Sequence, residues 1–198
     1  MTYKESITKE ELQELPQEKF EGEVVVITNK SDAKKAVTYL SQFPFLGFDT
    51  ETKPAFKKGQ INRVALLQLS TDDTAFLFRL KDFEMPDSLL KLLSNRDIVK
   101  AGAAIRDDIK ALQEKRYFKD GGFFELQDEA VNIGLKNFSL KKMAGIVLGI
   151  KISKAQQLSN WEADELTEAQ QRYAATDAWI SYKIYEHFMN HRDAKVVS

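Results

Sequence analysis

Two apolar runs separated by three residues set the tightest limit on the fold of this chain. Residues 63–70 (RVALLQLS) and 74–80 (TAFLFRL) are rich in branched and aromatic side chains, and the link between them is TDD. A link this short cannot return the chain to begin a parallel strand, so the two runs predict an antiparallel β-hairpin. Any sheet that the chain forms must contain this antiparallel pair.

The segments around the hairpin alternate between strand and helix patterns. Strand patterns occupy residues 23–28, 45–51, 97–103 and 122–128. Helical patterns occupy residues 31–43, 88–94, 106–115, 139–149 and 167–191. A hairpin combined with alternating strands and helices indicates an α/β fold, in which helices flank a mixed sheet.

The composition agrees with one globular domain. The chain has 198 residues, of which 43% are hydrophobic and 30% charged, and no repeat or Pro/Gly-rich linker divides it. We expect a polar arm with a short helix at residues 1–20, a single domain at 21–193 and a tail at 194–198. The absence of cysteine excludes disulfides, thiolate metal sites and cysteine nucleophiles.

Charge and hydropathy narrow the range of binding surfaces and cellular locations. The formal net charge is −1, so any nucleic-acid-binding surface must be a local concentration of basic residues. The first 15 residues lack the apolar core of a signal peptide. No apolar run approaches the ~20 residues of a membrane span. We therefore expect a cytoplasmic protein.

Two carboxylates stand at the end of an otherwise apolar strand. In FLGFDTE, Asp49 and Glu51 are two residues apart and so share one face of the strand. Burying a carboxylate is costly unless it is paired or bound to a cation. Taken alone, the pair fits an exposed strand end better than a metal site.

The last helical segment adds a third carboxylate. One helical face carries Tyr173, Asp177, Ile180, Ile184 and Phe188, at steps of four, three, four and four. Asp177 thus lies on an apolar stripe, with Tyr173 one turn earlier. A carboxylate there needs a basic partner at the edge of the stripe or a cation.

A fourth carboxylate lies at another junction of strand and helix. Asp107 and Asp108 open a helix, where acidic residues are common because they complement the helix dipole. Ligands of open α/β sheets also lie at such junctions. Carboxylates from three segments suit hard cations such as Mg²⁺ or Mn²⁺, and pairs of these ions hydrolyse phosphodiesters.

Three motifs in this order resemble those of the DEDD superfamily of 3′–5′ exonucleases, also called DnaQ-like or RNase H-like, in its tyrosine-bearing subgroup. The motifs are GFDTET at 47–52, AGAAIRDDIKAL at 101–112 and YAATD at 173–177. The likeness runs from about Glu23 to His187. It is greater to the Werner-type exonuclease domains than to ribonuclease D.

This resemblance implies an RNase H-like fold with a five-stranded mixed sheet flanked by helices. It also implies 3′–5′ hydrolysis with two Mg²⁺ or Mn²⁺ ions and release of nucleoside 5′-monophosphates. By position, the first ion would be held by Asp49, Glu51 and Asp177. Asp49 would also reach the second ion, and Asp108 would act on it through water. Tyr173 would position the attacking water.

The second motif offers two neighbouring aspartates. The family spacing Gly-x-x-Ile-x-x-Asp selects Asp108, counted from Gly102 and Ile105. Adjacent residues on a helix point about 100° apart, so Asp107 cannot serve equally well. Relatives often have Gly where this chain has Ala104, which alters the room near the motif.

A substrate would need polar, basic and aromatic side chains near these motifs. By resemblance, Thr52 would sit beside the terminal nucleotide and its 3′ hydroxyl. Trp161 could stack on a base, although a core position at the entry to the last helix suits it at least as well. Other candidates for contacts to phosphates or bases are Phe56, Lys57, Lys58, Arg63, Arg106, Lys154 and Arg172.

The leading interpretation is a 3′–5′ exonuclease acting on nucleic acid with a free 3′ end, with DNA favoured over RNA by the Werner-type likeness. One alternative is a nucleic-acid-binding module of the same fold that has lost catalysis. Others are an RNA-processing exonuclease of ribonuclease D type and a metal-stabilised domain that binds a protein partner. All five key positions carry the required residue types, which favours the enzyme.

Overall fold

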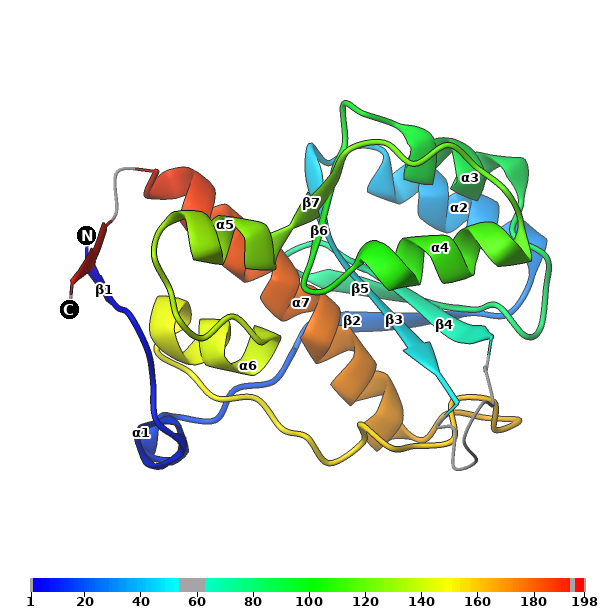
Figure 1. Ribbon diagram of the computed structural model, residues 1–198. Helices are drawn as coiled ribbons and strands as arrows, with labels where there is room; N and C mark the ends of the chain where they lie inside the picture. The colour runs from blue at the N-terminus through cyan, green and yellow to red at the C-terminus, as the bar shows by residue number, and fades with distance from the viewer. Residues whose placement is uncertain (1, 54–62, 193–194, 198) are drawn as a thin grey trace.

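The computed structural model describes residues 2–53, 63–192 and 195–197, and a six-stranded mixed sheet forms its centre (Figure 1). In spatial order the strands are β2 (Glu23–Ile27), β5 (Thr74–Arg79), β4 (Val64–Ser70), β3 (Phe45–Thr52), β6 (Val99–Gly102) and β7 (Phe123–Glu125). The predicted mixed sheet is therefore confirmed.

The hairpin is antiparallel, as the short link required. Strand β4 pairs antiparallel with β5 and with β3, whereas β2–β5, β3–β6 and β6–β7 are parallel pairs. The resemblance implied five strands, and the sheet has six. Strand β7 has only three residues and joins the edge of the sheet beside β6.

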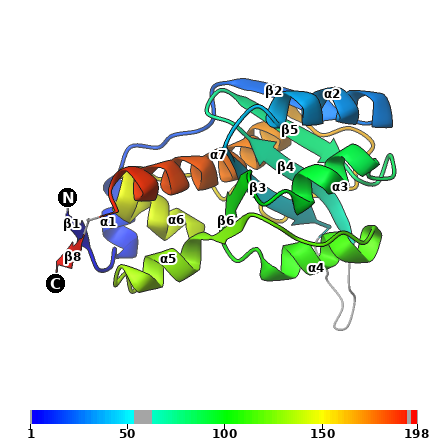
Figure 2. The same ribbon diagram turned by 90° about the horizontal axis from the view of Figure 1, so that it is seen from above.

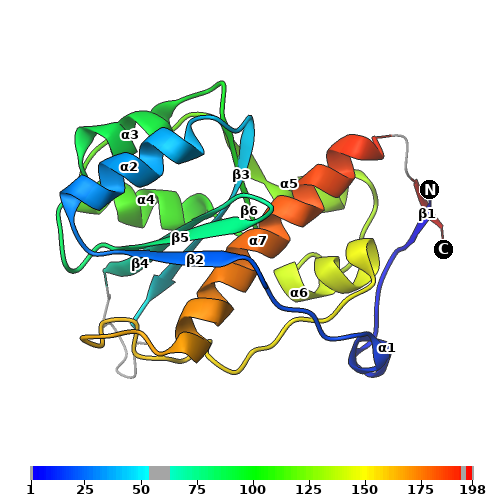
Figure 3. The ribbon, with the colours of Figure 1, turned by 180° about the vertical axis from the view of Figure 1, so that it is seen from behind.

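Helices cover both faces of the sheet (Figure 2). One face carries α2 (Lys30–Leu40), α3 (Asp87–Ser94) and α4 (Arg106–Lys115). The other carries α5 (Leu126–Asn132), α6 (Leu140–Met143), the π-helical turn η1 (Ala144–Leu148) and α7 (Glu168–Asn190). Figure 3 shows α7, the longest element with 23 residues, crossing the sheet.

The helix boundaries partly follow the sequence patterns. Helix α7 begins with the capping box of Thr167 and Gln170. Helix α2 begins one residue earlier than expected because the Asn29 side chain caps it. The strand expected at 122–128 stops at Glu125, whose side chain accepts from Gln127 N and so caps α5.

The N-terminal arm packs against the rest of the protein. Strand β1 (Thr2–Lys4) pairs with β8 (Lys195–Val197), and α1 (Lys9–Glu14) follows. Phe20 is buried, and its backbone N–H donates to Thr176 Oγ1 at 3.0 Å. Among the described residues, no helix combines the length and the apolar character needed to cross a bilayer.

Helix α7 rests directly on the backbone of β3. A Cβ added to Gly47 would lie 1.9 Å from Ala178 O and 2.9 Å from Tyr182 N. These are backbone atoms of α7, so neither can turn aside. Glycine at this position therefore permits a closer approach of strand and helix than any side chain would allow.

Replacing Gly47 with Ala should lower the free energy of unfolding by about 2–3 kcal/mol, since overpacking a core costs roughly 1–3 kcal/mol. Urea denaturation would measure the change. Gly145→Ala is the matched control, because its added Cβ meets the flexible end of Leu12 at 2.7 Å rather than backbone. Equal losses in the two variants would contradict this explanation.

Candidate active site

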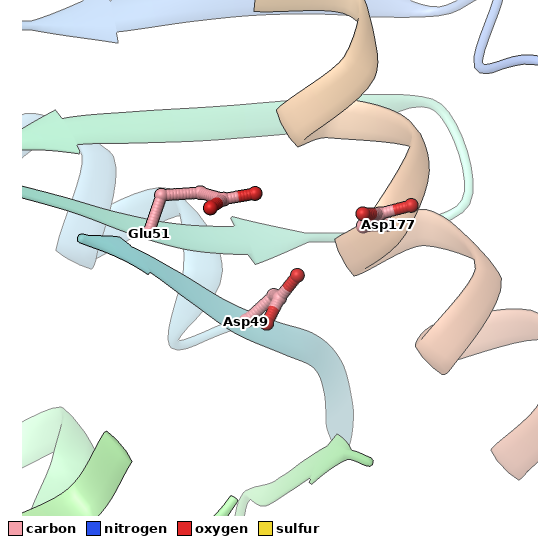
Figure 4. A group of neighbouring side chains, drawn as sticks. All are labelled: Asp49, Glu51 and Asp177. Atoms are coloured by element: carbon pink, nitrogen blue, oxygen red, sulfur yellow. The ribbon is translucent and has the colours of Figure 1, made fainter. Parts of the chain in front are cut away.

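Three carboxylates meet where β3 passes beneath α7. Asp49 and Glu51 project from one face of β3 toward Asp177 on α7 (Figure 4). One carboxylate oxygen from each lies within 4.8 Å of the other two. Within residues 2–53, 63–192 and 195–197, no lysine or arginine forms an ion pair with any of them.

Burial raises the pKa of all three carboxyl groups. The pKa of Glu51 rises to about 9 and that of Asp177 to about 6, and burial is the largest cause in both. Asp49 is raised well above its ordinary pKa by burial and then by the charges of Asp177 and Asp108. Such a cluster of oxygen ligands with excess negative charge fits a hard divalent cation.

Asp108 lies beside this group, and Asp107 does not. Asp108 Oδ1 accepts a hydrogen bond from Thr50 Oγ1 at 2.6 Å, and its charge contributes to the raised pKa of Asp49. The Asp107 side chain is 94% exposed and pairs with Lys110. The structure thus brings to the cluster the aspartate that the family spacing selects.

A strained turn places Asp108. Ala104 has φ 63°, in the left-handed region that costs an L-residue roughly 1–2 kcal/mol. Glu125 stabilises this turn by accepting from Ala104 N and Ile105 N, both at 2.8 Å. A glycine at this position would adopt the same conformation without that cost. The role of Glu125 carried no sequence signal, because its partners are 21 and 20 residues away.

The Tyr173 hydroxyl lies near the Asp177 carboxylate, one turn further along α7, and their interaction opposes the rise in the pKa of Asp177. Burial, followed by the charge of Asp177, raises the pKa of Tyr173 above its ordinary value. The hydroxyl therefore stays protonated at neutral pH and acts as a hydrogen-bond donor.

Trp161 is a core residue, so its predicted stacking on a base is wrong. Its side chain is 0% exposed and packs with Leu66, Leu77 and Ala174. Its ring centroid lies 6.1 Å from that of Tyr173. The alternative weighed from sequence, a core aromatic at the entry to the last helix, is what the structure shows.

Two predicted substrate contacts are engaged within the protein. Arg172 Nη1 donates to the carbonyl oxygens of Phe20 and Gly22, both at 2.9 Å, and so ties the arm to α7. Arg106 Nη2 contacts both carboxylate oxygens of Asp128, at 2.9 and 2.6 Å. Neither bond was foreseeable from the local sequence.

The remaining candidates are exposed or lie outside the described residues. Thr52 at the end of β3 and Arg63 just before β4 are both exposed. Lys154 is exposed in the loop that follows Lys151. The structure does not describe Phe56, Lys57 or Lys58.

Sequence reasoning missed Lys141 on α6. Its Nζ donates to Ile152 O at 3.2 Å, and burial lowers its pKa to about 8. The negative charge of Asp177 partly opposes this lowering of the pKa. The ammonium group of Lys141 therefore lies within electrostatic reach of the cluster. A lysine in the helical pattern 139–149 gave no sign of this proximity.

A cavity of about 380 Å³ adjoins the cluster. Tyr173 and Asp177 line it from α7, and Ser153 and Gln156 line it from the loop before that helix. Arm residues 17–19 close another side. Asp177 is the member of the cluster that lines this cavity, so a molecule of moderate size could reach the cluster there.

Known proteins resemble this chain in sequence. The profile of a 3′–5′ exonuclease family matches residues 24–192. The bifunctional 3′–5′ exonuclease/ATP-dependent helicase WRN of Mus musculus is 35% identical over 194 residues, which cover 92% of this chain and 14% of that protein. DNA polymerase I of Aquifex aeolicus is 28% identical over 159 residues, covering 80% of this chain and 26% of that protein. The chain thus spans about a quarter or less of these relatives.

Solved structures share the fold. The Nibbler EXO domain of Aedes aegypti superimposes with a TM-score of 0.79 at 22% identity, covering 90% of this chain and 95% of that one. Escherichia coli RNase D gives 0.77 at 21% identity, covering 85% and 44%. Trypanosoma brucei RNase D in complex with RNA U12 gives 0.77 at 23% identity, covering 88% and 65%. These likenesses confirm the RNase H-like exonuclease fold, and with the family match they show that this chain belongs to the 3′–5′ exonuclease family.

Proposed function

We propose that this exonuclease depends on Mg²⁺ or Mn²⁺ and releases nucleoside 5′-monophosphates from the 3′ end of nucleic acid. The proposal rests on the meeting of Asp49, Glu51 and Asp177 within 4.8 Å, without an ion pair to any described lysine or arginine. Buried acids with raised pKa values are a strong sign of a functional site. A divalent cation would offset their charge.

The acidic residues would hold the ions. Asp49, Glu51 and Asp177 would hold one ion, and Asp49 together with Asp108 would serve a second, with Asp108 acting through water. When bound, the ions lower the pKa of water and stabilise the charge that develops on the scissile phosphate. The Thr50 hydroxyl fixes the orientation of Asp108 by its hydrogen bond.

Tyr173 would orient the water that attacks the phosphorus. Its hydroxyl lies near Asp177, and burial raises its pKa, which favours a hydrogen-bond donor over a base at neutral pH. The proton of the water must therefore leave by another route. A positioned donor of this kind lowers the barrier by orientation rather than by proton transfer.

The cavity beside Tyr173 and Asp177 would take the end of the substrate. Thr52 and Lys154 are exposed and would contact the terminal nucleotide and a phosphate. DNA is favoured because identity to the WRN exonuclease is 35%. An RNA substrate is the second candidate, because a neighbour of the same fold is an RNase D bound to RNA.

The first prediction concerns Asp49→Ala. We expect this variant to lose more than about 100-fold in rate on end-labelled DNA, since losing a group that stabilises transition-state charge costs roughly 10²–10³. EDTA should abolish the wild-type activity. Asp107→Asn is the control and should retain the activity, because that side chain faces solvent. Degradation of DNA or RNA by the wild type in EDTA would contradict metal dependence.

The second prediction concerns Tyr173→Phe. This variant should retain its stabilisation by Mn²⁺ but lose about 10²-fold in kcat, the loss that a misplacement of a reacting group by about 1 Å can cause. Steady-state kinetics and thermal-shift titration would measure the two quantities. Tyr185→Phe, on the same helix, should leave both unchanged. A Tyr173→Phe variant with full kcat would refute the positioning role.

The third prediction is a pH dependence of stability without metal. Acids whose folded pKa is raised contribute stability below their unfolded pKa, and this is lost as pH rises through the folded pKa. The melting temperature in EDTA should thus fall as pH rises through about 6 for Asp177 and toward about 9 for Glu51. Mn²⁺ should remove most of this fall.

Differential scanning fluorimetry across this pH range would test the third prediction. Asp177→Asn should flatten the lower part of the curve, because the titrating group is gone. Asp107→Asn should leave the curve unchanged. A wild-type melting temperature that rises from pH 6 to 9 in EDTA would show that the cluster does not control this dependence.

A further inference from the structure

Gln68 is a fully buried amide in the middle of β4. Its side chain is 0% exposed, and within the described part of the chain neither its nitrogen nor its oxygen has a hydrogen-bond partner. The strand residues beside it, Leu67 and Leu69, are apolar and equally buried. A buried amide without a partner is unfavourable, and Leu or Met would fill similar space without that cost.

The strand register places this amide next to the acidic cluster. Gln68 is the direct antiparallel partner of Asp49 on β3, and its partner on β5 is Leu77. Paired residues of antiparallel strands project from the same face, with Cβ atoms about 4.5–5.5 Å apart. Of the two cross-strand neighbours, only Asp49 has a side chain that can accept a hydrogen bond.

This face of the sheet lies beneath the part of α7 that carries the site. Leu66 precedes Gln68 by two residues and shares its face. Leu66 packs in one buried cluster with Leu77 and with Ala174, which stands between Tyr173 and Asp177 on α7. The Gln68 side chain thus lies between the sheet and the segment of α7 that carries Tyr173 and Asp177.

Asp49 can accept a further hydrogen bond. Its Oδ1 accepts from Thr50 N at 2.9 Å. An ionised carboxylate has about four lone-pair sites, so capacity remains for a cation and for a second donor. Rotation about the outer bonds of the Gln68 side chain would turn its NH₂ group toward this carboxylate.

We propose that Gln68 is a positioning residue of the metal site, whose amide donates a hydrogen bond to the Asp49 carboxylate when the cluster binds cations. The inference rests on the metal binding proposed above. Carboxylates that ligate metals are themselves hydrogen-bonded, and losing such a partner typically costs about 10–100-fold in metal affinity or activity. The bond also explains why β4 keeps a polar residue in its core.

A thermal-shift titration of the full chain with Mn²⁺ alone tests this role in Gln68→Met. The half-saturating Mn²⁺ concentration should rise about 10–100-fold. Without Mn²⁺, the melting temperature should equal or exceed that of the wild type, since a buried amide without a partner has been removed. A lower melting temperature with an unchanged Mn²⁺ requirement would indicate a merely structural role and overturn the proposal.

Leu77→Met is the matched control, because it changes the packing on the other side of Gln68 without removing a donor. Its Mn²⁺ requirement should stay at the wild-type value. An equal rise in both variants would overturn the proposal, since any change of packing would then suffice. If the wild type itself shows no stabilisation by Mn²⁺, the proposed metal site fails, which is a different outcome from failure of the Gln68 role alone.

A measurement on the wild type covers the case in which Gln68→Met does not fold. The side-chain amide protons of Gln68 can be followed by NMR while Mg²⁺ is added. We expect their signals to shift and their exchange with solvent to slow as the hydrogen bond forms. Signals that stay unchanged while the Asp49 resonances respond to Mg²⁺ would overturn the proposal.

Discussion

The backbone contact between Gly47 on β3 and Ala178 on α7 determines where the acidic side chains of the site lie. Asp49 and Glu51 follow Gly47 along the strand, and Asp177 directly precedes Ala178. A side chain at position 47 would drive strand and helix apart, because its Cβ would lie 1.9 Å from Ala178 O. The three carboxylates repel one another, so packing of the backbone, and not attraction between side chains, brings them within 4.8 Å.

This arrangement opposes folding when no cation is bound. Burial and mutual repulsion raise the pKa values, which means that the charged cluster weakens the folded state. The nearby arginines do not relieve the charge, since Arg172 holds the arm and Arg106 pairs with Asp128. An acidic cluster left without arginine partners can take up the cation proposed above, at the expense of stability without one.

Local sequence patterns predicted the structural features that depend on residues close together in the sequence. The hairpin followed from a three-residue link, and the face of α7 followed from helical spacing. The burial of Trp161 and the two backbone bonds of Arg172 depend on partners distant in sequence, so residue type alone suggested contacts to substrate. The strand pattern at 122–128 located β7 but ran three residues past its end, because the Glu125 side chain caps α5 there. The left-handed turn at Ala104 gave no local sign, since alanine rarely adopts it.

The arm and the proposed catalytic residues share one stretch of α7. Arg172 and Thr176 bind the backbone at residues 20–22, while the next residues, Tyr173 and Asp177, face the cluster. The same arm walls the cavity with residues 17–19, yet the match to the exonuclease family begins at residue 24. The acids thus lie within the residues that the family profile matches, whereas the arm residues that line the cavity precede them. A change in the arm can therefore alter the shape of the cavity directly, and it can also reach Tyr173 and Asp177 through the hydrogen bonds of Arg172 and Thr176.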